Sequence, residues 1–129
     1  MRFLLILKIL VSFELLSGEV NSWECNKFEG AQIIGDDGDY LGVLGPSWKS
    51  DSIFNSSSPY GSTWSSDSIF NTSSKYGNEY SSTSVFNDNA SDPPMIIGDE
   101  GVLGYLSIGP SYDSSTYSPY DFKYTCDWD

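Results

Sequence analysis

The sequence predicts a mainly β protein with much turn and irregular structure. Three observations support this: a candidate hairpin in residues 31–45, a second in residues 95–109, and a motif that returns every 16 residues between 48 and 94. A motif that recurs at a fixed period usually marks stacked units that bury a shared face. A chain of 129 residues has room for one small domain. We therefore expect residues 23–129 to form a single repeat-built domain.

Residues 1–22 have the composition of a secretory signal helix that precedes this domain. A basic start is followed by an apolar run over residues 3–16, and the residues after it suit cleavage before Trp23. Lys8 and Glu14 interrupt the run, which argues against a stable transmembrane anchor, since about 20 apolar residues are needed to cross a bilayer. An uncleaved amphipathic helix is the alternative. The expected location is secreted, periplasmic or at the cell envelope.

The chain has two cysteines, Cys25 and Cys126, one near each end of the mature protein. In an oxidising compartment they are candidates for a disulfide. Closing a loop of about 100 residues is worth up to about 4.7 kcal/mol in the chain-entropy description. Two free thiols or an intermolecular bond are the alternatives to this bridge.

Residues 31–45 have the pattern of a β-hairpin. Two short apolar runs, 31–34 and 40–44, flank the segment Gly35-Asp36-Asp37-Gly38-Asp39. Asp-Gly is a strong hairpin signal because glycine accepts the positive φ that the tight turn requires. Gly42 within the second run predicts a bulge or a close backbone approach.

Residues 95–109 repeat that hairpin. The stretch from Ile96 to Gly101 matches the stretch from Ile33 to Gly38, and the Leu-Gly pair at 103–104 matches the one at 41–42. We expect a second, homologous hairpin here. Residues 110–129 resemble a shortened, degenerate copy of the repeat followed by a tail.

The tandem motif is Ser-x-Ser-Ile-Phe-Asn, followed by Tyr-Gly and opened six residues before its Phe by an aromatic residue. Ser and Asn compete with helix by bonding their own backbone, so each copy is expected to form a short strand or a single helical turn. We expect each copy to bury its Ile or Val, its Phe and its opening aromatic. The copies of the motif are residues 50–55, 66–71 and 82–87, and their opening aromatics are Trp48, Trp64 and Tyr80.

This order of features resembles a family of short exported bacterial proteins with tandem Ser-x-Ser-Ile-x-Asn and Tyr-Gly repeats flanked by Gly-Asp-Gly hairpins. The resemblance covers residues 25 to about 120. In that family the linker commonly reads Asn-Pro-Tyr-Gly, whereas residues 55–61 of this chain contain additional serines. The resemblance implies export and a repeat-built fold. The family carries no established activity, so it assigns no functional residue.

Charge and composition exclude several classes of function. Lys and Arg number 6 against 18 Asp and Glu, so the net charge is −12, which repels nucleic acid. The chain contains no His, which rules out His-based catalytic triads and His metal ligands. We expect no cofactor. An acidic hydrolase is the least favoured hypothesis, because the clustered carboxylates lie side by side on turns rather than facing each other across a cleft.

Two weak candidate sites remain. Asp36, Asp37 and Asp39 offer hard oxygen ligands that suit Ca²⁺, although solvated turn charges are the favoured interpretation. The second is a row of aromatic residues that could stack on sugar rings, beside Asn and Ser that could bond to hydroxyl groups. This aromatic row consists of Trp48, Trp64, Tyr80 and Tyr112. The favoured interpretation places these same rings in the core, because a chain with so few Leu and Val must bury other side chains.

Three N-glycosylation sequons begin at Asn55, Asn71 and Asn89. The first two occupy one position of the repeat and are expected to be by-products of it.

Taken together, these patterns predict a secreted, non-enzymatic repeat protein with a structural or binding role at the cell envelope or outside the cell. Its partner is undefined, with carbohydrate or another envelope protein as candidates. The alternative is a carbohydrate- or cell-wall-binding module that uses exposed Trp and Tyr.

Overall fold

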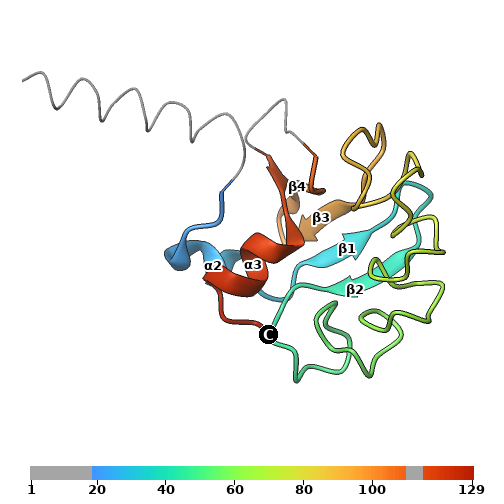
Figure 1. The fold of residues 1–129 in the computed structure, drawn as a ribbon. Helices are drawn as coiled ribbons and strands as arrows, with labels where there is room; N and C mark the ends of the chain where they lie inside the picture. The colour runs from blue at the N-terminus through green and yellow to red at the C-terminus, as the bar shows by residue number, and fades with distance from the viewer. Residues whose placement is uncertain (1–18, 110–114) are drawn as a thin grey trace, which may run out of the picture.

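A computed structural model of the chain describes residues 19–109 and 115–129. Most of the predicted signal segment and Tyr112 lie outside these ranges. The described residues form one mixed five-stranded sheet in the order β2-β1-β3-β4-β5, with short helices beside it (Figure 1). The strands are β1 (Gln32–Ile34), β2 (Tyr40–Val43), β3 (Met95–Gly98), β4 (Gly101–Leu106) and β5 (Thr116–Tyr117). The helical elements are η1 (Ser22–Glu24), α2 (Cys25–Phe28) and α3 (Pro119–Thr125).

Both predicted hairpins are present. β1 pairs with β2 and β3 pairs with β4, each antiparallel and each with one shift of register. The shift in the first hairpin lies beside Gly42, whose φ is +104°, and a Cβ there would lie 2.7 Å from the Cβ of Tyr60. The predicted close backbone approach at Gly42 is therefore confirmed.

The two hairpins join through β1 and β3, which also run antiparallel. Ile33 lies opposite Ile96, and these residues occupy the same position of the two matching sequences. Both side chains are fully buried. The hairpins are thus related by an approximate twofold axis through this pair, which places the same apolar position of each at the centre of the sheet.

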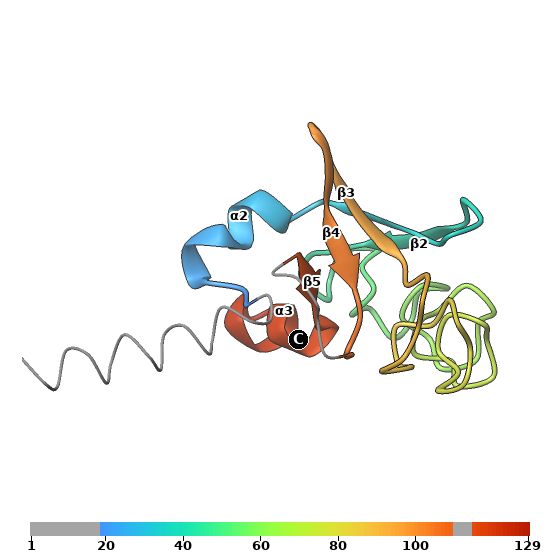
Figure 2. The ribbon, with the colours of Figure 1, turned by 90° about the horizontal axis from the view of Figure 1, so that it is seen from above.

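The repeat region between β2 and β3 contains neither strand nor helix. It is a series of tight turns with one isolated bridge, in which Ser52 lies parallel to Val43. The prediction of a short strand or helical turn in each copy is therefore wrong. Figures 1 and 2 show these loops gathered beside the sheet, with the tip of the β3–β4 hairpin extending away from them.

Side-chain oxygens explain why turns replace regular structure here. In each copy the second serine of the motif is buried, and its Oγ accepts a hydrogen bond from the backbone N–H two residues later. These bonds join Ser52 to Phe54 at 3.0 Å, Ser68 to Phe70 at 3.0 Å and Ser84 to Phe86 at 2.9 Å. A backbone N–H that already donates to the side chain of a nearby serine is not available to a helix or to a strand ladder.

The asparagine of each copy closes the turn from the other side. Its Nδ2 donates to the backbone carbonyl six residues earlier, and its Oδ1 accepts from the N–H two residues later. The Nδ2 bonds are Asn55 to Lys49, Asn71 to Ser65 and Asn87 to Ser81, each 2.9 Å long. The Oδ1 bonds come from Ser57, Ser73 and Asn89 at 2.9–3.0 Å. All three sequence copies therefore make the same pair of asparagine bonds.

Each copy contributes one fully buried aliphatic side chain to the core, as predicted: Ile53, Ile69 and Val85. The phenylalanines are partly buried, and their rings lie next to one another in chain order. We call Phe54, Phe70 and Phe86 the Phe ladder; its centroid separations are 6.4 Å and 5.6 Å. Because each ring contacts the ring of the next copy, the three copies lie side by side.

The C-terminal segment packs along this ladder. Tyr120 contacts Phe86 with ring centroids 5.8 Å apart, and Trp128 contacts Phe54 at 6.5 Å, so the two residues cover the two ends of the ladder. α3 starts at a helix cap, in which the Oγ of Ser118 accepts from the N–H of Tyr120 at 3.2 Å. The sequence prediction assigned no helix to this tail.

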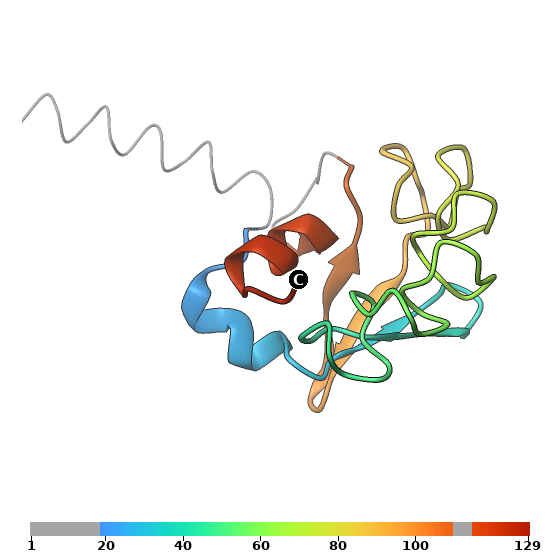
Figure 3. The ribbon, with the colours of Figure 1, turned by 60° about the horizontal axis from the view of Figure 1, so that its bottom comes forward.

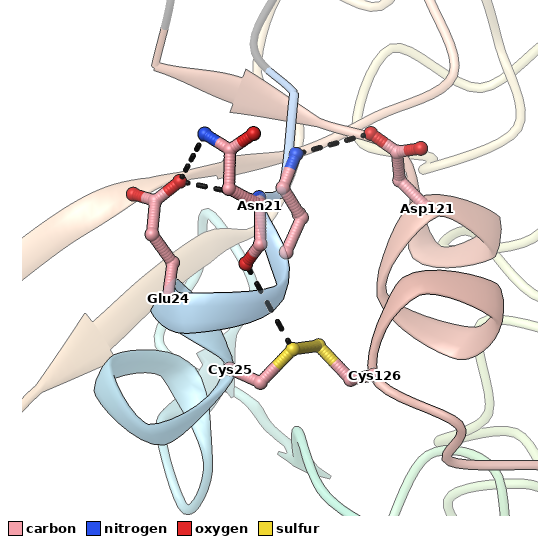
Figure 4. Close-up of a disulfide and its surroundings, with 6 residues drawn as sticks. Asn21, Glu24, Cys25, Asp121 and Cys126 are labelled. Carbon is pink, nitrogen blue, oxygen red and sulfur yellow. Dashed lines mark hydrogen bonds between the residues drawn. A yellow bond between two sulfur atoms is a disulfide. The ribbon is translucent and has the colours of Figure 1, made fainter.

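The predicted disulfide is present and holds α2 against α3. Cys25 and Cys126 have Cα atoms 5.6 Å apart, and the bridge joins the start of α2 to the end of α3 (Figure 4). The two helices lie next to each other in Figures 1 and 3 as well. Beneath them the ring of Phe28 lies 4.9 Å from that of Phe122. Among the described residues, no helix is long and apolar enough to span a membrane.

Candidate functional site

The opening aromatics of the three copies are exposed to solvent. Trp48 is 78% exposed, Trp64 is 90% exposed and Tyr80 is 84% exposed. The prediction that each copy buries its opening aromatic is wrong. Each copy instead turns one aliphatic side chain and one Phe towards the core, and the second copy also buries the ring of Tyr76.

Side-chain hydrogen bonds fix the backbone turn at two of these residues, Trp64 and Tyr80. The N–H of Trp64 donates to the Oγ of Ser62 at 3.1 Å, and the N–H of Tyr80 donates to the Oδ1 of Asn78 at 2.8 Å. In each case a polar side chain two residues earlier forms a turn, and the aromatic residue stands at its corner. Exposed Trp and Tyr on well-ordered turns are suited to contact a partner.

The surface beside Tyr80 is hollowed. A hollow of about 620 Å³ is lined by rings and by polar side chains of the second and third copies, and by two residues from beyond β3. Its lining comprises Ile69, Phe70, Thr72, Gly77, Asn78, Glu79, Tyr80, Phe86, Ile108 and Tyr120. A second hollow of about 430 Å³ shares Glu79, Tyr80, Phe86 and Ile108 and adds Asn87, Asp88 and Asn89. We call the two together the Tyr80 groove.

A third hollow also borders Tyr80. It measures about 370 Å³ and is lined by Ser73, Ser74, Lys75, Asn78, Tyr80 and Ser81. Tyr80 therefore borders three hollows. Sequence reasoning named Tyr80 but missed Asn78, Glu79 and Tyr120. The first two lie beside an opening aromatic and were detectable in principle, whereas Tyr120 reaches the groove only through the packing of α3.

Two of the three candidate calcium ligands, Asp37 and Asp39, are engaged by other residues, whereas Asp36 is exposed. The Oη of Tyr76 donates to Asp37 at 2.7 Å and also to Asp39, and the Nζ of Lys75 forms ion pairs with both carboxylates. The hydrogen bonds from Lys75 and Tyr76 lower the pKa of Asp37 to about 2. Among the described residues, no three Asp, Glu, Cys or His side chains are grouped to hold a metal ion. The carboxylates of the first hairpin loop thus bind side chains of the second copy.

Tyr76 is the buried residue of this contact between the hairpin loop and the second copy. Its ring is buried, and a Cβ on Gly35 would come within 2.7 Å of it. Burial and the hydrogen bonds to Asp39 and Asp37 raise the pKa of Tyr76 far above its ordinary value. The hydrogen bond and ion pair to Asp37 likewise raise the pKa of Lys75. The four residues Asp37, Asp39, Lys75 and Tyr76 form a structural cluster, because each of them bonds to at least one of the others.

The three sequons occupy different environments. Asn55 and Asn71 use both side-chain atoms in the turn bonds described above and are partly buried. Asn89 is exposed, and its Nδ2 donates to the neighbouring Asp88 at 3.2 Å. The expectation that the first two sequons accompany the repeat agrees with this structural use of their asparagines.

Comparison with protein-family models, curated proteins and solved structures finds no match to this chain. The resemblance to exported bacterial repeat proteins therefore stays a prediction.

Proposed function

We propose that the protein is an exported, non-enzymatic repeat protein that binds carbohydrate through the opening aromatics. The observation that carries this proposal is that Trp48, Trp64 and Tyr80 are almost fully exposed, while the aliphatic residue of every copy is fully buried. Large exposed rings cost solubility, and contiguous exposed apolar surface is typical of interaction sites. The same position of three copies is exposed, so the exposure follows from the repeat rather than from one irregular loop.

The arrangement of the copies supports a linear site. The Phe ladder orders the copies side by side, and each opening aromatic precedes its Phe by six residues. Equivalent positions of stacked units lie along one edge. We therefore expect the three rings to follow one another, which matches a chain-like ligand better than a single small molecule.

Sugars suit this surface chemically. A flat aromatic ring packs against the apolar C–H face of a sugar, while amides and hydroxyls bond to its hydroxyl groups; apolar walls with a few polar groups are what ligand sites generally present. The turns that carry the rings supply such groups, including Thr72 and Asn78. The net charge of −12 disfavours polyanionic ligands.

Export is supported by the disulfide, because such bonds persist in oxidising compartments. A binding role rather than hydrolysis is supported by the pairing of Asp37 and Asp39 with Lys75 and Tyr76. A general acid needs a carboxyl group that is free to exchange a proton with a substrate.

Binding to a panel of insoluble and soluble polysaccharides tests the proposal. Trp64→Ala and Tyr80→Ala should each weaken binding by roughly two- to tenfold, as expected for losing an aromatic contact worth about 0.5–1.5 kcal/mol. Trp23→Ala and Tyr124→Ala are matched controls, because these rings are 77% and 70% exposed but lie outside the repeat. Equal losses in all four variants, or no binding to any glycan, would contradict the proposal.

A further inference from the structure

We propose that the Tyr80 groove binds a sugar unit that carries a protonated amine, such as the glucosamine unit of a partly deacetylated hexosamine polymer. This inference rests on the proposed carbohydrate binding and specifies its ligand class.

The groove has the dimensions and the walls of a ligand site. Its two hollows, of about 620 Å³ and 430 Å³, fall within the range of roughly 300–1,000 Å³ that is usual for small-molecule sites. They share Glu79, Tyr80, Phe86 and Ile108, so they form one continuous depression. Tyr80 stands almost fully exposed at its border, which leaves the ring free to stack on a sugar.

Several polar side chains of the groove already have a structural task. The Oδ1 of Asn78 accepts from the N–H of Tyr80 at 2.8 Å. Asn87 closes its own turn through both ends of its amide. Asp88 accepts from the Nδ2 of Asn89 at 3.2 Å. These bonds shape the groove and reduce what the same atoms can offer to a ligand.

Glu79 is different. Within residues 19–109 and 115–129, its carboxylate has no hydrogen-bond or ion-pair partner, and it borders both hollows of the groove. Among the described residues that line the three hollows, the basic one is Lys75, which lines the third hollow and is paired with Asp37 and Asp39. The unpaired carboxylate of Glu79 thus lies beside the exposed ring of Tyr80, and no basic side chain of the groove neutralises it.

This combination complements an aminosugar. The ring of Tyr80 provides a stacking face, and the carboxylate of Glu79 provides an acceptor and a counter-charge for an ammonium group. A neutral sugar would use only the stacking face, and a uronic acid would be repelled by Glu79 and Asp88. The exposed ion pair is worth a modest factor, roughly two- to fivefold in affinity at low salt.

Calorimetric titration of the secreted, disulfide-bonded protein tests the inference. The probes are a glucosamine oligomer with free amines, the same oligomer fully N-acetylated, and a glucose oligomer of equal length. The free-amine oligomer should bind most tightly, and Glu79→Gln should lower its affinity two- to fivefold to the level of the acetylated oligomer. Glu79 is exposed and Gln has the same shape, so the fold should be retained.

Glu100→Gln is the matched control, because Glu100 is an exposed carboxylate at the tip of the second hairpin. If both variants lose the same affinity, attraction by the total negative charge explains binding and the groove inference is overturned. If all three oligomers bind equally well and Glu79→Gln has no effect, the inference fails while carbohydrate binding stands. If no oligomer binds at all, both the groove inference and the proposed carbohydrate binding fail.

Discussion

The asparagine that closes each turn should be among the most important polar residues of this fold. Replacing Asn71 with Ala removes two hydrogen bonds, each 2.9 Å long, one to the carbonyl of Ser65 and one from the N–H of Ser73. Each bond contributes about 0.5–1.5 kcal/mol net, so the free energy of unfolding should fall by about 1–3 kcal/mol. For a domain of this size the midpoint of thermal unfolding should drop on the order of 10 °C.

Two control variants isolate the asparagine bonds. Ser73→Ala leaves both bonds in place, since Ser73 contributes only its backbone N–H. Asn89→Ala removes one exposed side-chain bond of 3.2 Å to the neighbouring residue. Both controls should unfold within a few degrees of the parent protein in a calorimetric or circular-dichroism melt. If Asn71→Ala melts together with them, the turns are held by packing alone and the account of the repeat given above is wrong.

Three further predictions follow from the contacts. Reducing the disulfide, which closes a separation of 101 residues, should lower the free energy of unfolding by up to about 4.7 kcal/mol; an unchanged denaturant midpoint after reduction would argue against it. Gly77→Ala would place a Cβ 2.2 Å from the carbonyl oxygen of Asn71, so the free energy of unfolding should fall by about 1–3 kcal/mol or more. A Cβ on Gly30 meets no atom within 4 Å, so Gly30→Ala reports the backbone effect of its positive φ alone. The pKa of Asp37 is lowered from 3.8 to about 2, so its stabilising contribution is present above pH 3.8 and is lost as pH falls towards 2. Lys75→Met should flatten that part of the acid-unfolding curve, and an identical curve would contradict the pairing.

Much of this fold could be predicted from local patterns. The Asp-Gly turns and their flanking apolar runs predicted both hairpins, and the spacing of 16 residues predicted the buried Ile53, Ile69 and Val85. The disulfide was predicted from the number of cysteines and from the expected oxidising compartment. In each case the deciding interaction is local or is limited by the small number of available partners.

The candidate site was less predictable. The opening aromatics were expected to be buried because the chain has few Leu and Val. The structure builds its core from other rings instead: Phe28, Phe122 and Trp128 come from the two ends of the domain, and Tyr76 comes from the repeat itself. Residue type alone does not reveal which of two sets of aromatic rings is buried in the core.

The periodic turns are encoded locally, because the Ser and Asn side chains of each copy bond to nearby backbone groups, and the two hairpins are encoded locally through their glycines. Three other features depend on tertiary packing: β5 pairs in parallel with β4, the C-terminal segment lies along the Phe ladder, and a groove opens beside Tyr80. These features join residues far apart in the chain. They depend on how buried surfaces of several elements fit together, and no short stretch of sequence encodes that fit.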